Sequence, residues 1–126
     1  KEKSWVIGVS MGEYARAYDW NDLIAHSIIN DSFGTTPVLI LVEKDSSSFH
    51  GWSRRIAGRS LNFNVADSAE LIVDQQTHSS WNMSGWCIDG ELKGNQLARI
   101  PTYQEFWHSW RTFHPNTTRY PANSSQ

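Results

Sequence analysis

Short apolar segments alternate with tight turns along most of the chain, and this spacing limits the folds that it can adopt. Parallel strands need a crossover of about a dozen or more residues, usually a helix. Only one stretch, near the C-terminus, has the length and the apolar periodicity of such a helix. We therefore expect a mostly β (α+β) fold with antiparallel strands, arranged as a rolled sheet or small barrel.

Alternating apolar and polar side chains place the individual strands. Residues 5–20 are predicted to form a hairpin that turns at Met11-Gly12, and PVLILV at 37–42 is predicted to be the most buried strand. A second hairpin is expected to turn at Ala57-Gly58. Further strands are expected at 69–74, around 86–90 and at 97–100, which gives about seven strands in total.

Two helices are expected to accompany the strands. A short helix follows Asp19 or Asn21 and ends near His26. A longer amphipathic helix is predicted over residues 103–113, because Thr102 and Glu105 match a capping box and apolar side chains recur at helical spacing behind them. This helix is expected to pack on the sheet.

Length and charge exclude several classes of protein. The 126 residues favour one domain, predicted over 1–120, with a flexible tail at 121–126. The 11 Lys and Arg residues against 13 Asp and Glu give a net charge of -2, which argues against nucleic acid as a partner. No apolar run approaches the roughly 20 residues of a membrane span. The chain starts with KEKSW and no Met, so we expect a piece of a longer precursor, whose other domains are candidate partners.

Four short motifs follow one another along the chain. They are Arg16-Ala17-Tyr18; His26, Asn30 and Asp31; Asp74, Thr77, Ser79 and Trp81; and Trp107, Trp110, His114, Pro115 and Thr117. Through these motifs residues 5 to about 120 resemble the domain of unknown function 3179 family, whose members typically carry R-A-Y, H-E-x-x-N-D, D-x-x-T-x-S-x-W and W-x-x-W-x-x-x-H-P-x-T in this order. Ser27 replaces the acidic residue of the second motif.

The chain departs from the family directly after the strand predicted at 37–42. Family members usually read Y-C-P-x-C-G there, whereas this chain reads VEKDSS at 42–47. Two thiolates three residues apart can converge on one centre and run thiol or soft-metal chemistry, which Glu43 and Ser46 cannot do. We therefore expect no thiol chemistry, and we expect Cys87, the single cysteine, to be buried and inert.

The expected function is that of a non-catalytic, extracytoplasmic ligand-binding or accessory domain, and the location is implied by the resemblance alone. The candidate surface combines residues 26–31, the loop 43–50 and residues 74–81, because these segments carry polar side chains that strand packing does not require. The ligand is an unknown small molecule. The candidate binding residues are His26, Asn30, Asp31, Glu43, Ser46, His50, Arg54, Asp74 and Trp81.

A metal or redox accessory role is one alternative. In it His26, Glu43 and His50 would replace the thiol pair of the family, although the five histidines lack the spacings that place two imidazoles on one helix face. No cofactor is predicted otherwise. Catalysis by a serine triad is not favoured, since the serines at 46–48 lack the G-x-S-x-G elbow of a rigidly held nucleophile.

A carbohydrate-binding module is the second alternative. The chain contains seven Trp residues, and exposed indole rings stack on sugar faces. Trp52, Trp81 and Trp86 are the candidates for this role, whereas the remaining Trp residues are expected to be core.

Overall fold

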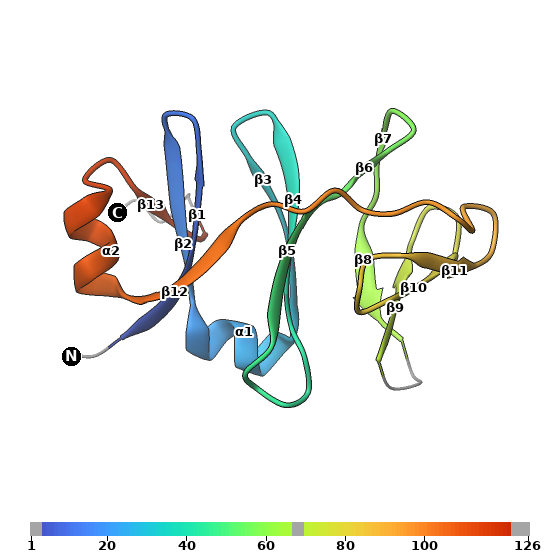
Figure 1. Ribbon diagram of the computed structural model, residues 1–126, viewed down its shortest axis with the longest axis horizontal. Helices are drawn as coiled ribbons and strands as arrows, with labels where there is room; N and C mark the ends of the chain where they lie inside the picture. Colours follow the sequence, from blue (N-terminus) through green and yellow to red (C-terminus); the bar gives the residue numbers. More distant parts are fainter. Residues whose placement is uncertain (1–3, 67–69, 122–126) are drawn as a thin grey trace. The chain divides into compact units, whose positions relative to one another are not determined.

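The computed structural model describes residues 4–66 and 70–121, and these form two compact units (Figure 1). The first unit comprises residues 1–26 and 101–126, and the second comprises residues 27–100. The described residues contain thirteen strands and two helices, so the mostly β prediction is confirmed. The single domain expected over 1–120 stays a prediction, and of the tail at 121–126 only Pro121 lies within the described residues.

The first unit is a four-stranded sheet with two short helices. Its elements are β1 (Trp5–Met11), β2 (Tyr14–Asp19), α1 (Trp20–His26), β12 (Thr102–Phe106), α2 (Trp107–Phe113) and β13 (Thr118–Arg119). The strand order is β12-β1-β2-β13, in which only β13 runs parallel to its neighbour. The predicted hairpin of residues 5–20 and the predicted short helix are both confirmed.

The predicted helix at 103–113 begins four residues later than expected, at Trp107. Residues 102–106 form strand β12 instead, which pairs with β1 from Trp5↔Phe106 to Val9↔Thr102. The expected capping box at Thr102 and Glu105 is therefore wrong, and the helix starts after an extended Phe106 without a side-chain cap. Pairing with β1 hydrogen-bonds this segment along one edge, and such tertiary pairing overrides a weak local helix signal.

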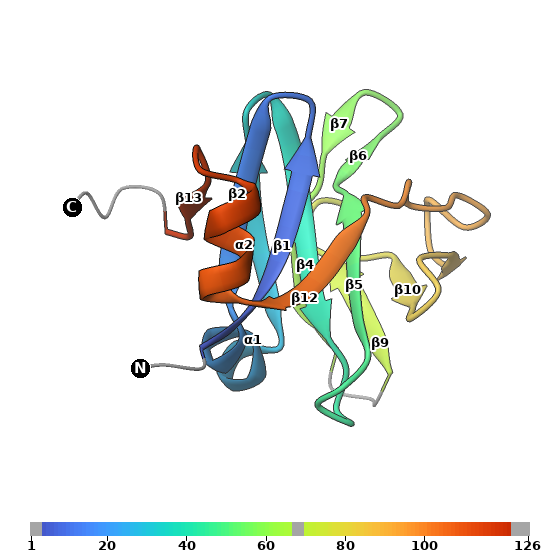
Figure 2. The same cartoon turned by 60° about the vertical axis from the view of Figure 1, so that its left-hand side comes forward.

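Helix α2 lies against the face formed by β1 and β12, as Figure 2 shows. Its buried residue is Trp110, which packs with Val6, Ala15 and Ala17 of the hairpin to form the core of this unit. The C-terminal amphipathic helix is thus packed on a sheet, as predicted. Neither described helix has the length and apolar character needed to cross a membrane.

The second unit contains three sheets. Its strands are β3 (Ile28–Phe33), β4 (Thr36–Val42), β5 (Phe49–Ser53), β6 (Arg55–Ile56), β7 (Arg59–Ser60), β8 (Phe63–Val65), β9 (Leu71–Asp74), β10 (Ser80–Asn82) and β11 (Cys87–Asp89). They pair in the orders β3-β4-β5, β6-β7 and β11-β10-β9-β8, all antiparallel. The described strands of the chain form separate sheets and do not close into a barrel.

Strand β4 is the centre of its sheet and is buried from Pro37 to Val42, as its run of apolar residues predicts. The predicted turn at Ala57-Gly58 joins β6 and β7, and both residues have positive φ angles, which suit a tight hairpin. The core of this unit is a cluster of buried apolar side chains from several strands: Leu39, Leu41, Trp52, Ile56, Leu61, Phe63, Ile72, Trp81, Cys87 and Leu97. One end of β4 lies beside the candidate site.

Candidate functional site

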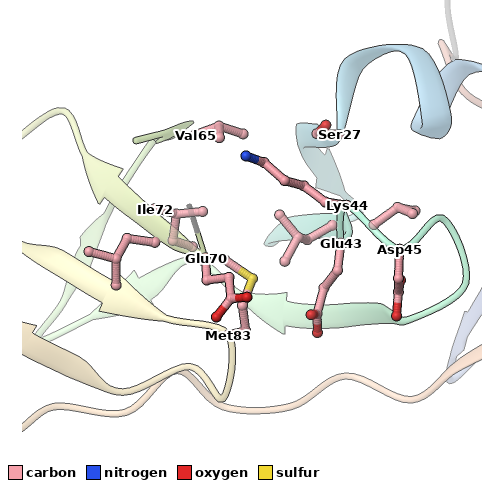
Figure 3. Close-up of a pocket in the computed structure, with 11 residues that line it drawn as sticks. Ser27, Glu43, Lys44, Asp45, Val65, Glu70, Ile72 and Met83 are labelled. Carbon is pink, nitrogen blue, oxygen red and sulfur yellow. The ribbon is translucent and has the colours of Figure 1, made fainter. Parts of the chain in front are cut away.

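A pocket of about 210 Å³ opens in the second unit where β4 ends (Figure 3). The end of β4 and the loop after it form one side, and residues at the facing ends of β8 and β9 form the other. Its apolar lining consists of Leu41, Val42, Val65, Leu71, Ile72 and Met83. Its polar lining consists of Ser27, Glu43, Lys44, Asp45 and Glu70.

Local hydrogen bonds shape the loop 43–48 beside this pocket. The amide of Glu43 donates to the carbonyl of Ser48 at 2.8 Å, and the amide of Ser46 donates to the carbonyl of Glu43 at 2.9 Å. Ser46, a predicted binding residue, has a positive φ angle of 59° and belongs to the turn itself. The loop therefore has a defined shape before any ligand arrives.

Asp45 holds the tip of the same loop. Its carboxylate accepts hydrogen bonds from the amides of Ser47 and Ser48, both at 2.9 Å, and from the Ser48 hydroxyl at 2.7 Å. These bonds favour the charged carboxylate, the Ser48 hydroxyl most of all, and they lower the pKa of Asp45 from 3.8 to about 2. Asp45 therefore stays anionic at the rim of the pocket at neutral pH.

Glu43 and His50 connect the two strands on either side of the loop. The Nε2 atom of His50 lies 2.6 Å from the carboxylate of Glu43. The imidazole of His50 also stacks on the indole of Trp52, with ring centroids 4.9 Å apart and an angle of 5° between the planes. Sequence analysis selected both residues of this pair, and the structure brings them together, with Glu43 in the pocket lining and His50 outside it.

Lys44 is the only basic side chain that lines the pocket among the described residues. Its side chain extends toward Val65 in Figure 3, on the opposite wall. No salt bridge or hydrogen bond of the Lys44 ammonium occurs within the described part of the chain. Together with the acidic side chains, it gives a rim with charges of both signs above apolar walls, an arrangement that suits an amphipathic molecule.

The D-x-x-T-x-S-x-W residues form an internal network and do not line the pocket. Asp74 and Trp81 are fully buried, and the indole Nε1 of Trp81 donates to the Asp74 carboxylate at 2.9 Å. The amide and the hydroxyl of Thr77 donate to the same carboxylate at 2.6 Å and 2.9 Å. The hydroxyls of Thr77 and Ser79 lie 2.6 Å apart. This motif therefore stabilises the segment between β9 and β10.

Asn30 and Arg54 also act inside the fold. The Asn30 side chain accepts a hydrogen bond from the amide of Phe63 and donates one to its carbonyl, so it joins β3 to β8. Arg54 is buried, and its guanidinium donates to three carbonyls, those of Val38, Asp31 and Leu61. Asp31 thus contributes at least its backbone to the same arrangement.

The remaining candidates have different positions. His26 ends α1 in the first unit and is exposed, whereas Glu43 and His50 belong to the second unit. Within residues 4–66 and 70–121, no three His, Cys, Asp or Glu side chains gather as a metal site would require. Of the three Trp candidates for sugar binding, Trp52 and Trp81 are buried and only Trp86 is exposed, which corrects the predicted role of the first two.

Several pocket residues were missed by sequence analysis. Val65, Leu71 and Ile72 read only as strand residues, and Met83 carries no motif. Lys44 and Asp45 lie inside the predicted loop 43–50 but were not singled out for binding. The signal that could have found them is the placement of a charged loop directly after the most buried strand, because such loops carry function on a rigid scaffold.

The only cysteine, Cys87, is buried and unpaired. Burial raises the pKa of its thiol above the ordinary value of 9.0. A thiol in this state is a poor nucleophile at neutral pH, as expected for an inert side chain.

Comparison with known protein families gives a match over most of the chain. Residues 1–117 match the model of the family described as "Protein of unknown function (DUF3179)". Neither a curated protein nor a solved structure matches the chain. The segment VEKDSS at 42–47 includes Val42 to Asp45 of the pocket lining.

Proposed function

The chain belongs to the DUF3179 family, and we propose that it is a non-catalytic ligand-binding or accessory domain that holds a small amphipathic molecule in the pocket beside β4. One observation carries this proposal. The segment VEKDSS at 42–47, which the family resemblance sets against Y-C-P-x-C-G, forms part of an apolar pocket whose rim bears charged side chains. The pocket thus lies where a change of function within the family is expected.

The chemistry of the lining defines the ligand. Leu41, Ile72 and Met83 offer apolar surface, so an aliphatic part of the ligand would be removed from water there. A charged or hydrogen-bonding end would remain at the rim, where Lys44 and Glu70 lie. A pocket of about 210 Å³ limits the ligand to a small molecule.

Binding is favoured over catalysis because the acidic groups of the loop already have partners. Glu43 pairs with His50, and Asp45 accepts three hydrogen bonds from its own loop. These contacts stabilise the shape of the site. We also propose an extracytoplasmic location for the protein, which rests on the family resemblance and is tested by fractionating cells that express the full-length gene.

The two methionines provide a direct test. Met83 lines the pocket, whereas Met11 is also half-buried but belongs to the first unit. Protein with ¹³C-labelled methionine methyl groups gives one NMR signal for each. Hexanoate, hexylamine and 1-hexanol serve as probes in separate titrations. We expect the Met83 signal to shift in a saturable way with hexanoate or hexylamine, while the Met11 signal stays in place.

A matched pair of variants locates the site. Val65, 44% exposed, lines the pocket, and Ile88, 42% exposed, is an apolar residue of the same sheet that does not. Val65→Phe should reduce the affinity for the probe by about tenfold by filling the pocket, whereas Ile88→Phe should leave it unchanged. The proposal is wrong if no probe shifts Met83, or if both variants bind as well as the parent.

The Glu43–His50 pair favours a second candidate, in which His50 binds a metal ion together with ligands that the described residues do not supply. Metal-ligating histidines commonly present one ring nitrogen to a carboxylate and the other to the metal. Added Zn²⁺ or Cu²⁺ would then raise the melting temperature, and Glu43→Gln and His50→Gln would each abolish the rise. A melting temperature that changes with neither ion contradicts this candidate. It has no bearing on the proposal of an amphipathic ligand.

A further inference from the structure

A second hollow, a groove of about 330 Å³, lies in the first unit and is independent of the proposed pocket. It is lined by residues of β1, β12 and the end of α2: Ser10, Tyr103, Glu105, Trp110, Phe113 and His114. Two of these belong to the closing motif W-x-x-W-x-x-x-H-P-x-T, which the pocket beside β4 does not use.

Strand register explains how the groove forms. Tyr103 pairs with Gly8 and Glu105 pairs with Val6, so the side chains of Tyr103 and Glu105 leave the same face of the sheet. Gly8 has no side chain, and a Cβ atom there would collide with the Trp110 ring. The absence of a side chain at Gly8 allows the Trp110 indole to pack directly on the sheet. Tyr103 and Glu105, on the same face, then form one side of the groove.

The motif residues fix the floor of the groove. The indole Nε1 of Trp110 donates to the Thr117 hydroxyl at 2.8 Å. The ring of His114 lies against the Trp110 ring, with centroids 3.9 Å apart. These contacts hold Trp110 in a buried position, so the groove does not depend on a ligand for its shape.

The groove exposes aromatic rings beside a carboxylate. Phe113 is 78% exposed and Tyr103 is 50% exposed, although both are large side chains that folding usually covers. Glu105 is half-buried, and its carboxylate forms no salt bridge or hydrogen bond within the described part of the chain. The one anionic side chain of the groove therefore lacks a cation, while apolar ring surface surrounds it.

We propose that this groove binds an organic cation with a quaternary ammonium group. Aromatic rings attract cations through the negative potential of their faces, and a quaternary ammonium is weakly hydrated because it has no N–H to donate to water, so it loses little on leaving water. The carboxylate of Glu105 supplies the opposite charge. An anionic ligand would meet repulsion from Glu105, and a neutral apolar ligand would leave this carboxylate unpaired and poorly solvated.

Cations already contact aromatic surface elsewhere in the same unit. The guanidinium of Arg119 lies 4.4 Å from the centre of the Trp107 ring, and that of Arg111 lies 5.8 Å from it. Neither arginine lines the groove. The groove therefore offers the same kind of contact to a cation from outside the described residues.

The test compares choline with 3,3-dimethylbutan-1-ol, an uncharged molecule of the same shape. Each is titrated into the protein at pH 8, where an ordinary imidazole is neutral. The indole N–H signal of Trp110 is the readout in ¹⁵N NMR spectra, with the exposed Trp86 of the other unit as internal control. We expect choline to shift the Trp110 signal in a saturable way, with at least tenfold weaker binding of the neutral molecule.

Three variants complete the test. Glu105→Gln and Phe113→Ala should each weaken choline binding, by about tenfold for the loss of the carboxylate. Gln104→Ala, at an exposed position of β12 outside the groove, should leave the affinity unchanged. Equal binding of the two molecules, no shift at Trp110, or full affinity in Glu105→Gln would each overturn the proposal. None of these results bears on the Met83 titration, so the two proposals fail separately.

Discussion

The indole Nε1 atom of Trp81 donates a hydrogen bond of 2.9 Å to the Oδ2 atom of Asp74, and both side chains are fully buried. A buried carboxylate is costly unless donors surround it, and here Thr77 adds further hydrogen bonds to those of the indole. The D-x-x-T-x-S-x-W motif, which the sequence indicates as part of a binding surface, therefore stabilises the second unit from within.

Asp74→Ala should lower the free energy of unfolding by about 3 kcal/mol, because buried donors of Trp81 and Thr77 lose their acceptor. Urea denaturation followed by tryptophan fluorescence measures the change. Asp89→Ala, at an exposed carboxylate of the same sheet, should change stability by no more than about 0.5 kcal/mol. Equal stability of both variants would contradict the role given to Asp74.

The carboxyl group of Asp45 should titrate near pH 2 in NMR experiments. Its pKa is lowered in the folded chain, so its contribution to loop stability is present above the ordinary pKa of 3.8 and is lost as the pH falls toward 2. Ser48→Ala should raise the pKa toward 3.8, because the Ser48 hydroxyl is the largest cause of the shift. Ser47→Ala keeps the backbone donor at that position and should have a smaller effect. A titration near pH 4 in the parent protein would argue against the loop geometry.

Cys87→Ser should leave any binding function unchanged and cost about 1 kcal/mol of stability, since the site is buried. The thiol of the folded protein should react slowly with iodoacetamide at neutral pH, because burial raises its pKa. The measurements are the alkylation rate by mass spectrometry and the probe affinity of the serine variant. Rapid alkylation together with lost binding would restore a thiol role.

Gly8→Ala should destabilise the protein by about 2 kcal/mol, because the added methyl group collides with the Trp110 ring and must displace it. The choline titration should also lose its Trp110 response in this variant. Gly12→Ala is the control: nothing lies within 4 Å of the new Cβ atom, and the cost is limited to about 1 kcal/mol for the positive φ angle. Thermal melting of the three proteins ranks these effects, and an unchanged melting temperature in Gly8→Ala would count against the packing described for α2.

Local pattern in the sequence determined much of the fold. Apolar alternation placed the hairpin of β1 and β2, the β-branched run placed the buried strand β4, and Ala57-Gly58 marked a tight turn. These features depend on neighbours within a few residues, so the chain carries the signal for them locally. The antiparallel class followed from the short distances between strands.

Strand β12 was misread because its structure depends on a partner about a hundred residues away. Thr102 and Glu105 satisfy the local rules for a helix start, yet pairing with β1 gives this segment a ladder of hydrogen bonds along one edge. Long-range pairing of this kind leaves no mark in a single sequence.

The role of each polar motif residue was also decided by the tertiary structure. The sequence indicates Asp74, Trp81, Asn30 and Arg54 as candidate binding residues, but in the fold their side chains bond to one another or to the backbone. Glu43 and His50 came from the same reasoning, and β4–β5 pairing brought them together beside the pocket. The sequence states which residues are polar, because polarity is a property of the residue type. Exposure and proximity arise only in the folded chain, and they distinguish a side chain that can contact a ligand from one that stabilises the core.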